Sequence, residues 1–273
     1  NLYLFDTKKS FEDYEYANVI RKNNRVKVRN LTKNEVKELE PNIANVYYAG
    51  QVFTGSRHTT NPLAISTKIF EKFLEIGGIY IKQNVKNIFQ NENRIELFLE
   101  DKKINFDKVI ISAGAWSNQI ANMLGDKFPL DTERGYHILF ETNEKLINRP
   151  VAWSESGFYL IQIHNGIRAA GTVEIAGLTK PSNKKRLEMI ERQSRKVLPQ
   201  LGDIKSTWMG RRPTLPDSLP IIGKSKQNNN VIYAFGHQHV GWTLGAVTGK
   251  IIDSLSKDQV PNIDITAYSP SRF

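Results

Sequence analysis

The alternation of apolar and polar residues is most informative over residues 231–256. Residues 231–235 are a run of Val, Ile, Tyr, Ala and Phe, which predicts a buried strand. The run breaks into Gly236-His-Gln-His-Val-Gly-Trp242 and then resumes with helical spacing, and we expect Thr243 to be the N-cap of that helix. A strand, a glycine turn and a helix N-terminus together direct backbone N–H groups at one place, which favours an electron-rich ligand. A glycine-rich turn with a purely structural role fits the same residues.

Three glycines mark one face of this predicted helix. Gly241, Gly245 and Gly249 recur every four residues. Residues at this spacing share one side of a helix, and glycine has no side chain to hold a neighbour away. We therefore expect this face to pack closely against another element.

A second strand, turn and helix repeat the same plan. Residues 107–112 read as a strand that runs into Ala113-Gly114-Ala115, and Ser117 is placed to cap an amphipathic helix over residues 118–124. Two such corners in one chain favour a ligand more strongly than either corner alone.

Before residue 113, helix and strand signals alternate. Thr32-Lys-Asn-Glu35 is a capping box in front of a short helix that Pro41 ends. A loop over residues 55–62 leads into a helix over about residues 62–76, which Gly77-Gly78 stops. The strands expected here cover residues 47–53, 79–88, 94–100, 103–106 and 109–112.

From Arg134 onward the pattern is that of antiparallel strands, with Asn165-Gly166 as a hairpin turn. A long polar helix is expected over residues 183–198, and residues 208–217 read as a loop or an edge strand. The other strands expected here cover residues 136–141, 151–153, 158–163, 167–173 and 219–223. The outline is an α/β part at 59–125 and 223–273 that flanks a β-rich part at 126–222.

Composition narrows the function without naming one. The 273 residues include 38 Lys and Arg against 28 Asp and Glu, a formal net charge of +10. The basic residues are scattered, which argues against a nucleic-acid partner, whereas an anionic substrate or an anionic membrane surface explains the charge equally well. No cysteine is present, so disulfides, thiolate metal sites and a cysteine nucleophile are excluded.

Location and length are expectations of the same kind. No apolar stretch approaches the length of a bilayer-spanning helix, and we expect a cytoplasmic protein, with peripheral contact at the inner face of the cell membrane as an alternative. Asn1 is not an initiator methionine, and residues 2–5 read as a core strand with no earlier strand to pair with. We therefore expect an N-terminal portion to be missing.

Several segments together resemble the D-amino acid oxidase superfamily of flavoproteins, in particular its bacterial D-amino acid dehydrogenase branch. These segments are, in order, Asp107–Ser117, Arg134-Gly-Tyr-His137, Gly210-Arg-Arg-Pro213 with Pro216-Asp217, residues 236–244, and the ending Tyr268-Ser-Pro-Ser-Arg-Phe273. One departure is the Gly-x-Gly-x-x-Gly fingerprint with which these flavoproteins begin, because nothing in this chain fits it.

The resemblance implies an α/β (α+β) fold in two parts. The first is a split FAD-binding domain of the D-amino acid oxidase type, residues 59–125 and 223–273, which lacks its N-terminal βαβ unit. The second is a substrate domain with an antiparallel sheet, residues 1–58 and 126–222. The missing N-terminal segment would then be a partner of this chain.

The resemblance also implies an FAD-dependent oxidation of a D-amino acid or a related amine. In this family a hydride passes from the α-carbon of the amino acid to N5 of the flavin, and water hydrolyses the resulting imino acid. The electrons pass on to a quinone or to oxygen, so a dehydrogenase and a glycine- or sarcosine-type oxidase both stay open. A truncated substrate-binding fragment that does not hold FAD is a further alternative.

Residue by residue, the resemblance assigns catalytic and binding roles. Arg212 matches the arginine that binds the substrate carboxylate through two parallel hydrogen bonds, and its strand neighbour Arg211 is expected to face solvent. Tyr159 and His58 are candidates to face the substrate, and His237 to lie beside the flavin ring; each also fits a structural role. The cofactor-binding set is Val85, Ala113, Gly114, Ala115, Trp116, Gly236, His237, Gly241, Trp242, Thr243 and Leu244, with Val85 in a strand.

Other chemistries lack their motifs. There is no His-x-x-x-His or His-Glu-x-x-His spacing for a metal, and we expect no metal site. A Gly-x-Ser-x-Gly nucleophile elbow and a Walker-type phosphate loop are also missing from the sequence.

Overall fold

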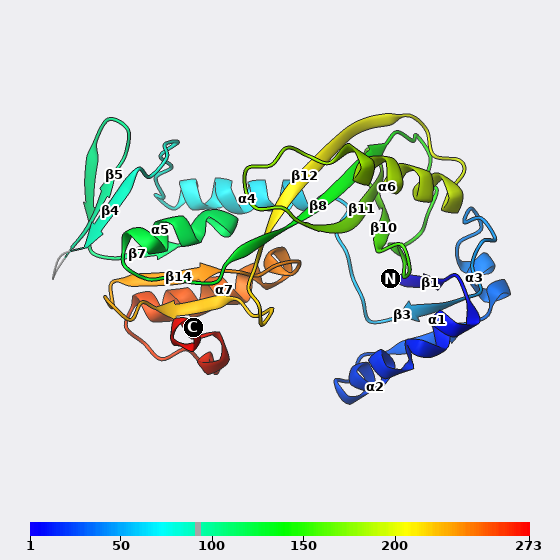
Figure 1. The fold of residues 1–273 in the computed structure, drawn as a ribbon, viewed down its shortest axis with the longest axis horizontal. Helices are drawn as coiled ribbons and strands as arrows, with labels where there is room; N and C mark the ends of the chain where they lie inside the picture. Colours follow the sequence, from blue (N-terminus) through cyan, green and yellow to red (C-terminus); the bar gives the residue numbers. More distant parts are fainter. Residues whose placement is uncertain (91–93) are drawn as a thin grey trace. The chain divides into compact units, whose positions relative to one another are not determined.

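A computed structural model describes residues 1–90 and 94–273, which form two compact units (Figure 1). Unit 1 contains residues 1–78, 135–173 and 181–210, and unit 2 contains residues 79–134, 174–180 and 211–273. These bounds differ from the expected division: residues 59–78 belong to unit 1, and residues 126–134, 174–180 and 211–222 belong to unit 2. In the described ranges no helix combines the length and the apolar character needed to cross a membrane.

An eight-stranded, mostly antiparallel sheet is the frame of unit 1. Its strand order is β12-β8-β11-β10-β9-β1-β3-β2. The strands are β1 (Leu2–Phe5), β2 (Val28–Leu31), β3 (Ala49–Phe53), β8 (Asp131–Phe140), β9 (Val151–Trp153), β10 (Phe158–Ile163), β11 (Gly166–Ile175) and β12 (Ile204–Thr214). The first strand, β1, pairs with two later strands, antiparallel to β3 and parallel to β9. Residues 208–214 lie in an edge strand, as predicted.

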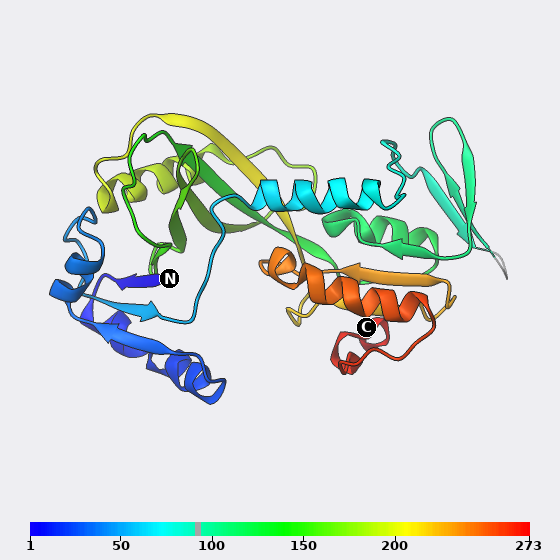
Figure 2. The same ribbon diagram turned by 180° about the vertical axis from the view of Figure 1, so that it is seen from behind.

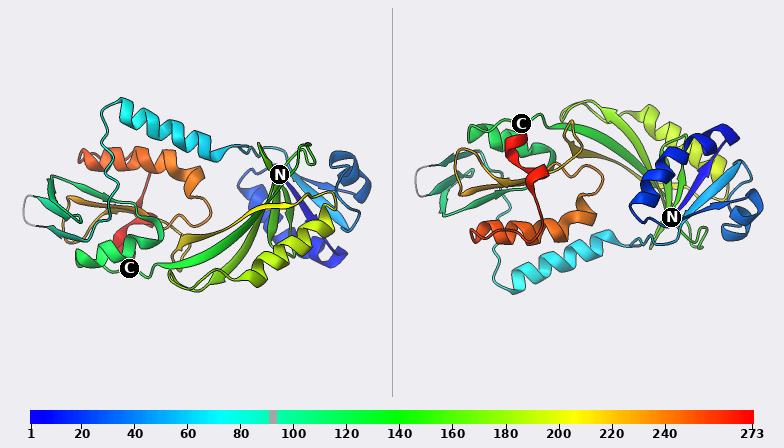
Figure 3. Two further views of the ribbon diagram at one scale, coloured as in Figure 1. Left: turned by 90° about the horizontal axis from the view of Figure 1, so that it is seen from above. Right: turned by 90° about the horizontal axis from the view of Figure 1, so that it is seen from below.

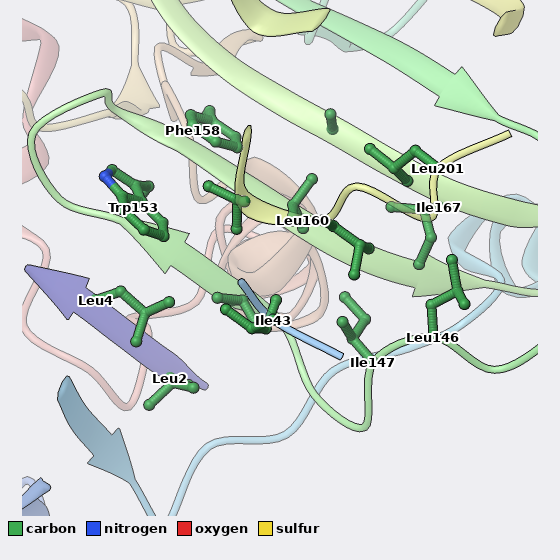
Figure 4. Packing of buried hydrophobic residues seen from close by; sticks show 14 of the residues in the cluster. Leu2, Leu4, Ile43, Leu146, Ile147, Trp153, Phe158, Leu160, Ile167 and Leu201 are labelled. Carbon is green, nitrogen blue, oxygen red and sulfur yellow. The ribbon is translucent and has the colours of Figure 1, made fainter. Parts of the chain in front are cut away.

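One face of this sheet carries the main hydrophobic core. Strand residues alternate between faces, so Leu2 and Leu4 point into the core while Tyr3 points to the other face. Figure 4 shows the packing, with Trp153, Phe158, Leu160 and Ile167 contributed by β9, β10 and β11. Helices α3 (Lys33–Leu39) and α6 (Lys184–Val197) cover this face, and α6 lies along the strands in Figure 3.

Local signals predicted these helices well. The capping box is present, since the Glu35 backbone N–H donates to Thr32 Oγ1 over 3.3 Å and the Thr32 backbone N–H donates to Glu35 Oε2 over 2.8 Å. Helix α6 begins after Asn183, whose side chain caps it.

The opposite face of the sheet is partly covered by α1 (Lys8–Asp13) and α2 (Glu15–Asn23), two helices that the sequence pattern did not predict. The ring of Phe5 makes edge contacts with Phe11 and Tyr14 at centroid distances of 5.4 and 5.0 Å. Because α1 and α2 each span three turns or fewer, aromatic contacts rather than helical periodicity hold them in place.

Helix α4 (Pro62–Glu75) forms as predicted but buries none of its residues in the described chain. Asn61 caps its first turn, since Asn61 Oδ1 accepts from the Ala64 backbone N–H over 3.0 Å. Its apolar side chains, such as Leu63 and Ile69, remain exposed. The apolar stripe therefore predicted the helix correctly without identifying what it packs against.

Unit 2 is built on a three-stranded sheet with the order β13-β14-β7. Its strands are β7 (Val109–Ile111), β13 (Ile221–Lys224) and β14 (Val231–Phe235). Helix α7 (Gly241–Ser256) covers one face through Ile251, Ile252 and Leu255 (Figure 2). On the other face, Ala121 of α5 (Ser117–Met123) shares a core with the antiparallel strands β4 (Asn87–Gln90) and β5 (Ile95–Phe98), which β6 (Lys103–Phe106) extends. Three 3₁₀ turns complete the unit: η1 (Gly114–Trp116), η2 (Thr266–Tyr268) and η3 (Pro270–Arg272).

Three local predictions for unit 2 were wrong. Residues 79–86 are not a strand, so Val85 lies in a loop, and the apolar side chains of residues 79–81 stay exposed. Helix α7 begins at Gly241 with Val240 as its N-cap, which places Thr243 inside the first turn. Helix α5 begins at Ser117, because the turn η1 already positions the chain for it.

The close packing expected for the glycine face of α7 stays a prediction. A Cβ added at Gly245 or Gly249 would meet no described atom within 4 Å. No element of the described chain therefore packs closely against that face.

Candidate functional site

The two glycine corners leave the same edge of the unit 2 sheet. Strands β7 and β14 are adjacent and parallel, with Val109 opposite Val231 and Ile111 opposite Tyr233. Each strand runs directly into its corner, residues 112–116 after β7 and residues 236–240 after β14. The carboxyl edge of a parallel sheet is where ligands bind in open α/β folds.

The corner after β14 requires glycine at its first position. Gly236 has φ +87°, in the left-handed region, and an added Cβ would lie 2.6 Å from Cδ1 of Leu215. The turn then closes on itself, since the Val240 backbone N–H donates to the His237 carbonyl over 3.0 Å.

Helix α7 presents an uncapped N-terminus at this corner. Among the described residues no side chain caps its first turn, and the turn itself contains no acidic residue to offset the positive end of the helix dipole. The Leu244 backbone N–H donates to the Val240 carbonyl over 2.9 Å. Leu244 therefore does not offer its N–H to a ligand as expected, and the first turn begins earlier, at Gly241.

His237 points back toward α7. Its Nε2 lies 3.0 Å from Oγ1 of Thr248, and burial lowers the pKa of the imidazole below its usual value. At pH 7 the ring is therefore mostly neutral. His239 lies differently, with Nε2 3.3 Å from Oε2 of Glu133.

The corner after β7 leaves open space beside the backbone of Gly114. Gly114 has φ +57°, and a Cβ added there would meet nothing within 4 Å. Ala115 is buried, and the Trp116 ring is 46% exposed with the guanidinium carbon of Arg211 5.7 Å from its centroid. Arg211 Nε also donates to the Leu178 carbonyl over 2.7 Å, so the expectation that Arg211 simply faces solvent was wrong.

Arg212 belongs to the same neighbourhood as the corner after β14. The Gln238 backbone N–H donates to the carbonyl of Pro213, the next residue along β12, over 3.0 Å. Arg212 is half-buried; burial lowers the pKa of its guanidinium, and the nearby charge of Glu133 opposes that shift. Since an arginine stays charged in proteins, the result is a partly desolvated cation beside the glycine turn.

The remaining substrate-side candidates lie in unit 1. Tyr159 points to the non-core face of the large sheet, where its hydroxyl bonds that of Tyr3, and burial raises the pKa of the phenol. His58 is exposed and lines a cavity of about 480 Å³ together with Phe53, Arg57 and Arg149. Tyr159 is not among the residues that line the cavity at His58.

The same non-core face holds residues to which the sequence analysis assigned no role. The imidazole of His137 stacks on the Trp208 indole at a centroid distance of 5.1 Å and an interplanar angle of 21°. Burial, reinforced by the charge of Arg168, lowers the pKa of His137 to about 4. Strand alternation combined with the β10–β11 register, Ile161 opposite Arg168, would have placed Arg168 and Tyr159 on one face.

Comparison with known proteins identifies the family. Residues 1–255 match the family described as FAD dependent oxidoreductase (DAO). The chain is 33% identical over 249 residues to a D-amino-acid oxidase of Bradyrhizobium diazoefficiens, covering 89% of this chain and 59% of that protein. It is 27% identical over 253 residues to the hydrogen cyanide synthase subunit HcnC of Pseudomonas protegens, covering 90% of this chain and 60% of that protein. The chain thus spans about three-fifths of the length of these curated relatives.

Solved structures agree on the fold. Glycine oxidase from Geobacillus kaustophilus superposes with a TM-score of 0.91 at 19% identity, covering all of this chain and 74% of that one. L-proline dehydrogenase from P. horikoshii gives a TM-score of 0.85 at 22% identity, covering all of this chain and 75% of that one. The mixed α/β fold expected from the resemblance is confirmed, and the chain belongs to the DAO family of FAD-dependent oxidoreductases.

Proposed function

We propose that the protein oxidises a D-amino acid or a related amine with FAD, and that this chain provides the carboxylate-binding arginine and part of the flavin site. The observation that supports this is the arrangement in unit 2, where both glycine corners leave one sheet edge and Gln238 hydrogen-bonds the strand of Arg212. The 33% identity to a D-amino-acid oxidase supports the substrate class.

The residues at that edge fit a large anionic ligand such as FAD. Gly114 leaves open space beside the backbone, and the uncapped first turn of α7 offers a positive dipole end. Ala113, Ala115 and Trp116 would border the cofactor from one corner, and Gly236, His237, Gly241, Trp242 and Thr243 from the other. When bound, FAD supplies the acceptor for the hydride that leaves the substrate.

Arg212 would hold the substrate carboxylate. A planar guanidinium makes two parallel hydrogen bonds to a carboxylate, and partial burial strengthens both by removing competing water. Fixing the carboxylate in this way orients the α-carbon and costs little entropy at the moment of reaction. His237, neutral and held by Thr248, would border the ring without adding a charge.

Tyr159 and His58 are proposed as substrate-facing residues, and Val85 as a backbone contact to the adenine end of FAD. These three roles rest on the family resemblance. A free amine group on the substrate can enter neutral, so no protein base is required for its oxidation.

The test is reduction of bound FAD by substrate in the protein expressed from its complete gene. After gel filtration the protein should retain flavin absorbance, and anaerobic D-alanine should bleach it. Peroxide release in air would then identify an oxidase, and reduction of an artificial dye without peroxide a D-amino acid dehydrogenase. Retained flavin that neither D-alanine, glycine nor iminodiacetate bleaches would contradict the proposed function.

A further inference from the structure

The non-core face of the unit 1 sheet carries a guanidinium that the proposed function does not use. Arg168 lies on β11 between Ile167 and Ala169, both of which are fully buried in the core. Strand alternation therefore turns Arg168 to the opposite face. There it lies opposite Ile161 of β10, while Ala170, the next residue of β11 on that face, lies opposite Tyr159.

Within residues 1–90 and 94–273, the buried Nε of Arg168 has no hydrogen-bond partner. Burial alone lowers the pKa of this guanidinium, and no carboxylate counteracts the shift. An unpaired, partly buried charge is costly, because the protein does not replace the hydrogen bonds that water would make. A ligand that accepts from Nε–H would recover this free energy on binding.

The surroundings indicate the chemistry of that ligand. The half-buried side chains next to Arg168, Ile161 and Ala170, are apolar. The imidazole of His137, which stacks on Trp208, lies close enough to Arg168 to feel its charge. This imidazole is uncharged at pH 7, since the pKa of His137 lies at about 4. A guanidinium bordered by apolar and neutral aromatic side chains suits a planar anion with a short apolar body, and a carboxylate matches the geometry of a guanidinium.

We propose that the non-core face of the unit 1 sheet binds a small carboxylate through Nε of Arg168. The site lies within unit 1 and does not depend on Arg212. The bound group is a free organic acid, and this site does not rest on the proposed function.

The direct test is NMR of arginine side-chain Nε–H groups in ¹⁵N-labelled protein, titrated with sodium propionate. The Arg168 signal, assigned by its loss in Arg168→Lys, should shift saturably with propionate but not with the neutral analogue propionamide. By calorimetry, Arg168→Met should weaken propionate binding at least tenfold, whereas Arg192→Met, at an exposed position of α6, should leave it unchanged.

A purely structural arginine would behave differently. Arg168→Met removes an unpaired charge, so its melting temperature should equal or exceed that of the wild type. If Arg168→Met does not fold, Arg168→Lys provides the calorimetric comparison. An unshifted Arg168 signal, equal weakening by Arg192→Met, or tighter binding of inorganic phosphate than of propionate would overturn the proposal.

Discussion

Replacing Gly236 with alanine tests whether the corner after β14 is built as described. The left-handed backbone at φ +87° costs a residue with a Cβ about 1–2 kcal/mol. The new Cβ would also lie 2.6 Å from Cδ1 of Leu215, which is 1% exposed within the unit 2 core. Overpacking of this kind costs about 1–3 kcal/mol, so the total is roughly 2–5 kcal/mol.

Two other glycines of unit 2 provide matched controls. Gly114→Ala meets no atom but keeps a left-handed backbone at φ +57°, so it should cost only about 1–2 kcal/mol. Gly245→Ala lies in an exposed part of α7 with open space around it, and should stabilise the helix by about 1 kcal/mol. The expected order of stability is therefore Gly245→Ala, wild type, Gly114→Ala and Gly236→Ala.

Hydrogen–deuterium exchange of the β14 amides, residues 231–235, measures this order within unit 2. Since 1.4 kcal/mol is a factor of ten, Gly236→Ala should accelerate exchange by about 30-fold to more than 1000-fold. Equal acceleration by Gly236→Ala and Gly114→Ala would refute the close contact with Leu215. Slower exchange in Gly236→Ala than in the wild type would refute the left-handed turn itself.

Two further predictions concern charges in unit 2. Lys108 and Lys224 each lie 2.5 Å from Asp258 and lower the pKa of its carboxyl from 3.8 to about 2. The carboxylate therefore stabilises the fold above about pH 4 and loses that effect as the pH falls toward 2. The melting temperatures of the wild type and Asp258→Asn should converge over this pH window. A constant difference between the two melting temperatures would contradict the assignment. Arg272 Nε donates to Asp217 Oδ2 over 2.6 Å, so Arg272→Met should loosen the C-terminal turn by about 1 kcal/mol and accelerate limited proteolysis there, whereas unchanged cleavage would show that the pair does not hold the terminus.

Local sequence signals predicted those elements whose physical cause is local. Strands β9 and β10 have the predicted bounds, because each is an apolar run bordered by turn residues. The capping box at Thr32 and the helix after Asn61 formed as expected, since side-chain caps act within one turn.

Features that depend on distant residues were not accessible in the same way. The pairing of β1 with β3 and β9 joins positions up to about 150 residues apart, and nothing in residues 2–5 encodes those partners. The apolar residues 79–81 resemble a strand in sequence, but their side chains stay exposed and the segment is irregular. Helix α7 starts two residues before Thr243 because the glycine turn, and not a capping side chain, sets its first residue.

In the candidate site, too, the local features were predictable from the sequence and the contacts between distant residues were not. The two glycine corners were visible in the sequence, and the parallel pairing of β7 with β14 brings them to one edge. The interaction of Arg211 with Leu178 and Trp116 could not be predicted from the sequence, because it depends on a loop far from β12 in the sequence. Arg168 was missed because the sequence does not show which face of the sheet an arginine in a strand points to, nor which side chains surround it.

The central claim is that Arg212 binds the substrate carboxylate beside the glycine corner that follows β14. The most direct measurement is kcat/KM for D-alanine in FAD-loaded Arg212→Met, with Arg192→Met as the control. Loss of a partly buried, bidentate charge pair costs about 2–5 kcal/mol, so kcat/KM should fall by about 30-fold to more than 1000-fold while flavin absorbance is retained. Full flavin content with an unchanged kcat/KM would contradict the account.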